Sequence, residues 1–150
     1  MINADAMKRW TDLSEKDQKQ LLLFPAYISL LACTGENGMD KQEKNAALKI
    51  AHIKTFASDP ELHDFYKAAE IDFEKELIAL NKNLPHNRED RKRAITRELH
   101  NLEPILKKLN GHYAAILEHS MQSYKNYVSR AHQNILEYFI FPLPVNGISD

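Results

Sequence analysis

Three acidic side chains lie close together in the glycine-containing segment TGENGMDKQE, residues 34–43. Glu36, Asp40 and Glu43 could offer carboxylate oxygens to a hard divalent cation, and calcium and magnesium prefer oxygen ligands. The sequence therefore predicts a candidate metal site, with calcium or magnesium as its ion. The same spacing has a purely structural interpretation, because an acidic residue followed three positions later by glutamate is typical of a capping box at a helix start.

The segment does not fit the loop of an EF-hand. Aligning Gly38 with the invariant glycine of that loop places Cys33 at the first ligand position and Lys44 at the position of the bidentate glutamate. A thiol and an ammonium group cannot provide those carboxylate ligands. An EF-hand is therefore excluded.

The residues around the turn resemble a known family. The stretch AYISLLACTGENGMDKQEKNAALKIA, residues 26–51, combines an apolar helix, an acidic glycine turn, a capping residue and an alanine-rich helix. It resembles the TerB-like tellurite-resistance family. In the family pattern one residue separates an Asp-Gly pair from the hydrophobic position. Here Asn37 replaces the aspartate and Met39 follows Gly38 directly, so the turn is one residue shorter. The resemblance implies a small all-α domain with an acidic metal-binding surface and a role in metal stress.

Histidines provide a second set of candidate ligands. His112 and His119 are seven residues apart, and His100 and Glu103 are three apart, so each pair shares a helical face. A ferritin-like di-iron site needs Glu-x-x-His motifs on two helices. Since no glutamate here has a histidine three positions later, we expect surface or boundary histidines. A ferritin-like metal-dependent oxidase with non-standard ligands is the enzymatic alternative.

Composition limits the classes of protein to consider. The chain has 150 residues, 43% of them hydrophobic and 27% charged, with a net charge of −1, which favours a single globular domain. The near-neutral charge gives no attraction to nucleic acid or an anionic membrane. Cys33 is the only cysteine, which excludes an internal disulfide and a thiolate zinc site. We expect a buried, inert thiol.

The apolar segment LLLFPAYISLLAC, residues 21–33, is not expected to be an export signal or a membrane span. It is too short to cross a bilayer, and the residues before it carry balanced acidic and basic charges instead of a short positive region. The basic run at 88–97 is interrupted by acids and lacks aromatic residues, so nucleic-acid binding is not expected either. The sequence predicts a cytoplasmic protein.

Apolar residues recur every three to four positions through most of the chain. This spacing predicts an all-α fold, a compact bundle of five to seven helices with a long C-terminal helix. The first helix is apolar on nearly all sides, so we expect it in the middle of the bundle. The clearest amphipathic series is Leu62, Tyr66, Ala69, Phe73, Leu77, Leu80 and Leu84.

Start and stop residues divide this pattern into helices. Ser14 is a good N-cap, and Pro25 should kink or break the first helix. Asp59 and Pro60 should stop one helix and start the next. Asn87 should begin a helix that Pro104 interrupts, and the Asn110–Gly111 pair should end it, because glycine tolerates a left-handed cap.

The last predicted helix runs from about His112 to Phe139. Its apolar residues form a seam of coiled-coil type, and the preceding helix is its expected antiparallel partner. The seam consists of Leu117, Met121, Tyr124, Val128, Ala131, Ile135 and Tyr138. The apolar segment YFIFPLPV, 138–145, either folds back onto the bundle or buries against a second copy. A homodimer through this helix and tail is therefore one predicted partner arrangement.

We conclude that residues 1–150 form one helical domain, with an N-terminal arm at 1–13 and a C-terminal tail at 142–150. The sequence favours a non-enzymatic protein, TerB-like and with a cation-binding turn. An interaction or homodimerisation module without metal and the metal-dependent oxidase are the alternatives.

Overall fold

The computed structural model describes residues 9–33 and 38–130. Within these residues the fold is all-α, as the periodicity predicts, and it has no strand. Two short 3-10 helices, η2 (Trp10–Asp12) and η3 (Pro60–Leu62), accompany the α-helices. The α-helices are α1 (Glu15–Leu21), α2 (Phe24–Ala32), α3 (Lys41–Ala57), α4 (His63–Asn83), α5 (Arg88–Asn101), α6 (Glu103–Leu106) and α7 (Gly111–Ser129).

Most helix boundaries lie at the residues that the sequence indicates. The Ser14 hydroxyl accepts a hydrogen bond from the Asp17 amide at 3.1 Å and begins α1. Pro25 lies in the first turn of α2 and separates it from α1, because proline lacks the donor that a continuous helix would need. Pro104 likewise lies in the first turn of α6, after α5 has ended at Asn101.

The prediction for Asn110 and Gly111 is wrong. Asn110 is the N-cap of α7, and its side-chain oxygen accepts from the amide of His112 at 2.8 Å. Gly111 is the first residue of α7, and its φ is not positive. Asparagine serves both as an N-cap and in turns, so the pair marks a helix start here.

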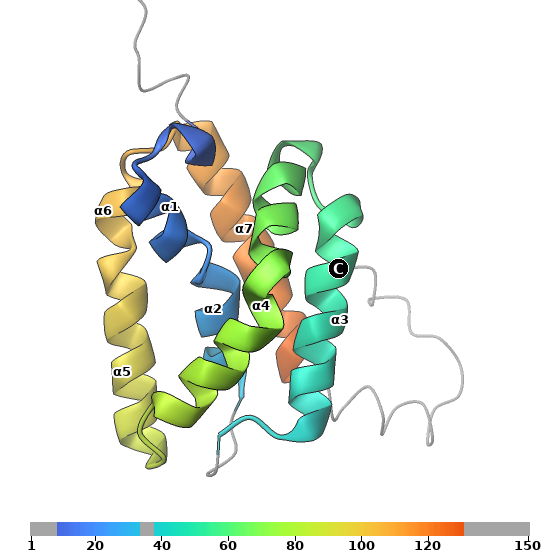
Figure 1. Ribbon diagram of the computed structural model, residues 1–150, viewed down its shortest axis with the longest axis vertical. Coiled ribbons are helices and arrows are strands. Elements are labelled where there is room, and N and C mark those ends of the chain that lie inside the picture. Colours follow the sequence, from blue (N-terminus) through green and yellow to red (C-terminus); the bar gives the residue numbers. More distant parts are fainter. Residues whose placement is uncertain (1–8, 34–37, 131–150) are drawn as a thin grey trace, which may run out of the picture.

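Helix α2 lies in the centre of the bundle, as its apolar sequence predicts. It contacts α4, α5 and α7 (Figure 1). All of its residues except Leu31 are buried. Ser29 is the one polar residue among them, and its hydroxyl donates to the Pro25 carbonyl at 2.8 Å inside the same helix. A helix that is apolar on every side can bury all of its faces only in this position.

The predicted pairing of the last helix with the preceding one is wrong. Helix α7 packs mainly on α2 and α3, whereas α5 packs on α2 (Figure 1). The loop between α6 and α7 is short, but both α5 and α7 pack on the apolar helix α2. Leu117, Met121, Tyr124 and Val128 are all buried in the bundle.

Part of the predicted N-terminal arm is folded onto the bundle. Leu13 is buried, and the Trp10 ring meets Phe65 of α4 edge to face, with centroids 6.0 Å apart. Trp10 and Leu13 are three positions apart, so the 3-10 turn directs both to the same side.

Several predictions concern residues outside the described ranges. These are the arm before Arg9, the seam positions Ala131, Ile135 and Tyr138, the apolar segment at 138–145 with its homodimer contact, and the tail at 142–150. Among the described helices, none combines the length and apolar character that crossing a membrane requires.

Candidate functional site

The turn before α3 meets the ends of α4 and α5. Gly38 has φ +84°, which glycine adopts without the steric cost of a Cβ atom. The amide of Met39 donates to the side-chain oxygen of Asn81, near the end of α4, at 3.1 Å. A Cβ atom at Gly38 would lie 2.8 Å from that same oxygen. Glycine is required here for both conformation and space.

The predicted metal ligands Asp40 and Glu43 form a capping box. Asp40 Oδ1 accepts from the Glu43 amide at 2.8 Å, and Glu43 Oε1 accepts from the Asp40 amide at 3.0 Å. Glu36 lies outside the described residues. Among the residues that are described, no three or more His, Cys, Asp or Glu side chains are grouped so that they could hold a metal ion. The three-carboxylate site stays a prediction.

Arg91, which belongs to the basic run at 88–97, is a buried cation beside this turn. Its side chain is only 5% exposed. Nη1 donates to the carbonyls of Asn81 at 3.2 Å and Pro85 at 3.3 Å, and Nη2 donates to the Asn81 side chain. The guanidinium thus satisfies carbonyls at the end of α4. Its position four residues before the buried Ile95 was the signal that could have revealed it.

Cys33, at the end of α2, is half-buried near the same cluster. Its thiol donates to the Ser29 carbonyl at 3.2 Å. Burial raises the pKa of the Cys33 thiol, the negative charge of Glu43 raises it further, and Arg91 opposes the shift. The thiol therefore stays protonated at neutral pH, but Cys33 is only half-buried and not fully buried as the sequence predicts.

An open groove of about 530 Å³ lies between α1–α2 and α4. We call it the α4 groove. Its floor is apolar and consists of Leu22, Leu23, Ala26, Ala69 and Phe73. Leu22 and Leu23 are half-buried, while Ala26 and Phe73 belong to the core. The floor is thus an extension of the hydrophobic core to the surface.

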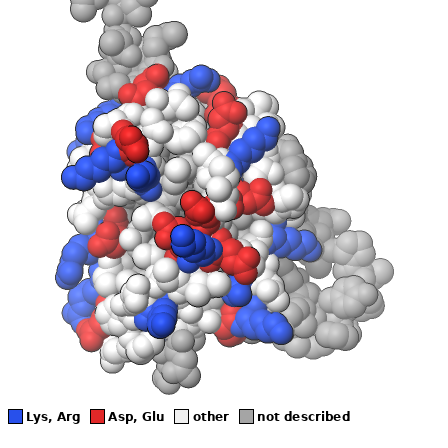
Figure 2. All heavy atoms as spheres, viewed as in Figure 1, with Lys and Arg blue, Asp and Glu red and all other residues white. Residues whose placement is uncertain are grey.

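Opposite charges line the two sides of the α4 groove. Lys16 and Lys19 come from α1, and Asp72 and Glu76 come from α4. Lys19 lies 3.6 Å from Glu15 in an exposed pair within α1, and such pairs contribute little. Figure 2 shows basic and acidic side chains interspersed over this face of the molecule, without a large area of one sign. This distribution does not suit a nucleic-acid backbone.

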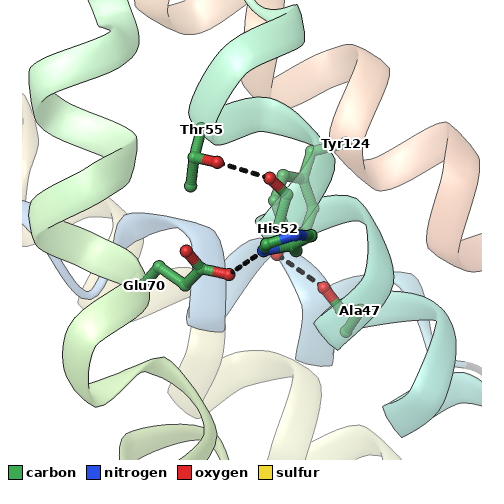
Figure 3. Close-up of polar contacts among 5 residues, drawn as sticks. All are labelled: Ala47, His52, Thr55, Glu70 and Tyr124. Atoms are coloured by element: carbon green, nitrogen blue, oxygen red, sulfur yellow. Dashed lines mark hydrogen bonds and ion pairs between the residues drawn. The ribbon is translucent and has the colours of Figure 1, made fainter.

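The acidic residues of α4 do not converge on a site. Glu70 lies 2.7 Å from the His52 ring on α3, and Glu74 lies 3.5 Å from Lys44 (Figure 3 shows the first pair). Asp72 and Glu76 lie on the side of the α4 groove instead. The acidic side chains of α4 thus have separate partners and do not form a common site.

The candidate histidines lie at the surface. His112 and His119 are exposed and line a second groove, between α3 and α7. His100 lies 3.3 Å from Glu103, with both side chains exposed. None of these three histidines points into the bundle interior, where a ferritin-like oxidase holds its metal.

Comparison with protein-family models, with curated proteins and with solved structures finds no match to this chain. The TerB-like resemblance stays a prediction. Functional proposals for this protein depend on the geometry of its described residues.

Proposed function

We propose that this protein is a non-enzymatic interaction domain that binds an amphipathic helix of a protein partner in the α4 groove. The observation that carries the proposal is the apolar floor between sides of opposite charge. Helix-in-groove recognition needs an apolar surface that accepts one face of the ligand. The extension of the core between α1–α2 and α4 provides it.

The groove has dimensions suited to a short helical contact. Its residues on α4 extend from Ala68 to Glu76, which is about 12 Å at 1.5 Å per residue, or about two helical turns. The side chains of Ala26, Ala68 and Ala69 are small, so a helix can approach this surface closely. The axes of two packed helices approach most closely where the side chains between them are small.

The charged sides favour one orientation of the partner helix. Lys16 and Lys19 attract acidic residues on one flank of an incoming helix, and Asp72 and Glu76 attract basic residues on the other. Turning the helix end for end would place like charges together. The groove therefore selects a partner with an apolar stripe between an acidic and a basic flank.

A designed peptide tests the proposal. The probe is an amphipathic helix of about four turns, with leucines at i, i+4 and i+7, glutamates on one flank and lysines on the other. Its control has glutamates on both flanks, so that in either direction one acidic flank faces Asp72 and Glu76. In an NMR titration we expect amide shifts at 16–26 and 68–76, and binding about tenfold tighter than that of the control, because like charges across an interface are unfavourable.

Two variants on α4 sharpen the experiment. Ala68→Glu places a longer, charged side chain in the groove and should abolish binding of the peptide. Lys67→Glu is the matched control, because Lys67 is exposed and does not line the groove. Equal affinity of the two designed peptides, or normal binding by Ala68→Glu, would show that the α4 groove is not the interaction site.

The competing functions predict different experimental results. A TerB-like cation site would respond to calcium or magnesium with shifts confined to the turn, at 38–43. A homodimer would show a mass that rises with protein concentration. Neither result is expected from a monomeric domain whose α4 groove recognises a helical partner.

A further inference from the structure

A second groove, of about 640 Å³, lies on the other side of the molecule's core, between α3 and α7. We call it the α7 groove. Its residues on α7 recur every three to four positions and form one helical face: His112, Ile116, His119, Ser123 and Asn126. The end of α3 and the 3-10 helix η3 form the opposite side, with Lys54, Ala57, Ser58, Asp59 and Leu62. Its volume is within the range of small-molecule sites.

Lys54 is the central charged group of the α7 groove. Its ammonium donates to the hydroxyl of Ser123 at 3.3 Å. Burial lowers the pKa of Lys54, because a half-buried cation loses part of its hydration. In the described part of the chain no carboxylate lies within ion-pair distance of it, so this partly dehydrated charge has only a neutral hydroxyl as its partner.

The wall beside Lys54 is rigid. Ser120 lies one turn before Ser123 and is buried, and its hydroxyl is 2.5 Å from the Tyr66 hydroxyl on α4. Tyr124, next to Ser123 in the chain, donates to the Ala47 carbonyl of α3 at 3.0 Å. These contacts hold α7 against α3 and α4, so the helices that carry Lys54 and Ser123 keep their spacing and little reorganisation of the backbone is needed on binding.

The remaining surface is partly apolar and partly basic. Ala57, Ala115 and Ile116 contribute apolar area. His119 is exposed along the groove, and His112 lies 3.6 Å from Glu61 at its edge. Asp59 is the only acidic residue among those that line the groove.

We propose that the α7 groove binds a small organic carboxylate, with the carboxylate at Lys54 and Ser123 and the apolar body of the ligand against Ile116 and Ala115. An ammonium and a hydroxyl donor side by side can each bond one carboxylate oxygen. The apolar residues favour a ligand with a hydrophobic body over an inorganic anion. The site shares no residue with the α4 groove and is independent of the proposed function.

Benzoate is a suitable probe, with inorganic phosphate and chloride at equal ionic strength as comparisons. In an NMR titration of the full chain we expect saturable shifts of amides at 54–62 and 112–126 with benzoate. Phosphate should bind more weakly, and chloride should not saturate. Absence of a saturable benzoate response at millimolar concentrations, or tighter binding of phosphate than of benzoate, would overturn the proposal.

Matched lysine variants test whether the ammonium group of Lys54 binds the carboxylate of the ligand. Lys54→Met keeps a side chain as long as the aliphatic part of lysine but removes the ammonium, and we expect benzoate binding to weaken at least about tenfold. Lys49→Met is the control, because Lys49 is exposed on the same helix and does not line the groove. Thermal melting of both variants checks that they fold. Wild-type affinity in a folded Lys54→Met variant would contradict the assignment.

Discussion

The phenol of Tyr124 on α7 donates a hydrogen bond to the backbone carbonyl of Ala47 on α3 across 3.0 Å, and both residues are fully buried (Figure 3). Their sequence separation of 77 residues makes this contact a tertiary one. Burial of the Tyr124 phenol between these helices raises its pKa. The bond therefore joins two helices at a point from which water is excluded.

Replacing Tyr124 with phenylalanine should lower the free energy of unfolding by about 1 kcal/mol, since one buried hydrogen bond is lost. Tyr113→Phe is the matched control. Tyr113 is also buried, but its hydroxyl has no hydrogen-bond partner among the described residues. We expect this second change to be neutral or slightly stabilising. Urea denaturation of the two variants checks the difference, and equal losses would contradict it.

The two described glycines should respond oppositely to alanine. Gly38→Ala should destabilise the fold by about 1–3 kcal/mol, because alanine is strained at φ +84° and its Cβ would lie 2.8 Å from Asn81 Oδ1. Gly111→Ala meets nothing within 4 Å and should stabilise by about 0.4–1 kcal/mol. Melting temperatures that move in the same direction would refute this account of the turn.

Arg91→Met should destabilise the protein by about 1–3 kcal/mol, because the carbonyls of Asn81 and Pro85 lose a buried donor. Arg93→Met on the same helix is the comparison. Arg93 is exposed, and within the described ranges its ion-pair partner is Asp90, at 3.1 Å, so its loss should change stability by less than about 0.5 kcal/mol. Guanidinium denaturation of both variants measures the two effects.

Stability should fall in alkaline solution. Burial raises the pKa of Tyr27, Tyr66, Tyr113 and Tyr124 above the ordinary value of 10.0. Between that value and the folded-state pKa, the unfolded chain has released protons that the folded protein retains, so unfolding becomes more favourable as pH rises. The contribution is fully present below pH 10. Lys54 and Arg91, whose pKa values are lowered, act in the opposite direction but are two groups against four tyrosines.

A pH titration followed by phenolate absorbance and circular dichroism tests this linkage. We expect the free energy of unfolding to decrease once pH exceeds about 10, and the buried phenols to ionise together with the loss of helix. Ionisation of all the tyrosines with the ordinary pKa, while the helices persist, would show that these side chains are not buried as described.

Local sequence features predicted the local structure well. Caps and prolines act through hydrogen bonds within one turn, so Ser14, Pro25 and the Asp40–Glu43 box could be interpreted without knowledge of the neighbouring helices. The prediction for Asn110 failed because asparagine is common both in turns after a helix and as the N-cap of the next one. Only the helix that follows decides between these two roles.

Long-range relations could not be predicted in this way. The apolar seam of α7 predicted which of its residues are buried, but it did not specify the helix on which they pack. The seam packs on α2 and α3 and not mainly on α5. Arg91 was missed because a charged residue in a basic run is normally exposed. The two grooves combine residues from elements far apart in the chain, and no single motif contains them.

The central position of α2 also has a consequence for biosynthesis. Its contacts with α7 can be complete only after residue 129 has been made, and that residue follows the end of α2 by 97 positions. At about 5–20 residues per second, translation takes roughly 5–20 s to cover this interval. During that time a nine-residue apolar helix, too short to be stable alone, emerges from the ribosome without its main neighbour. Nascent chains of this protein should therefore depend on chaperone protection of residues 24–32 until α7 is complete.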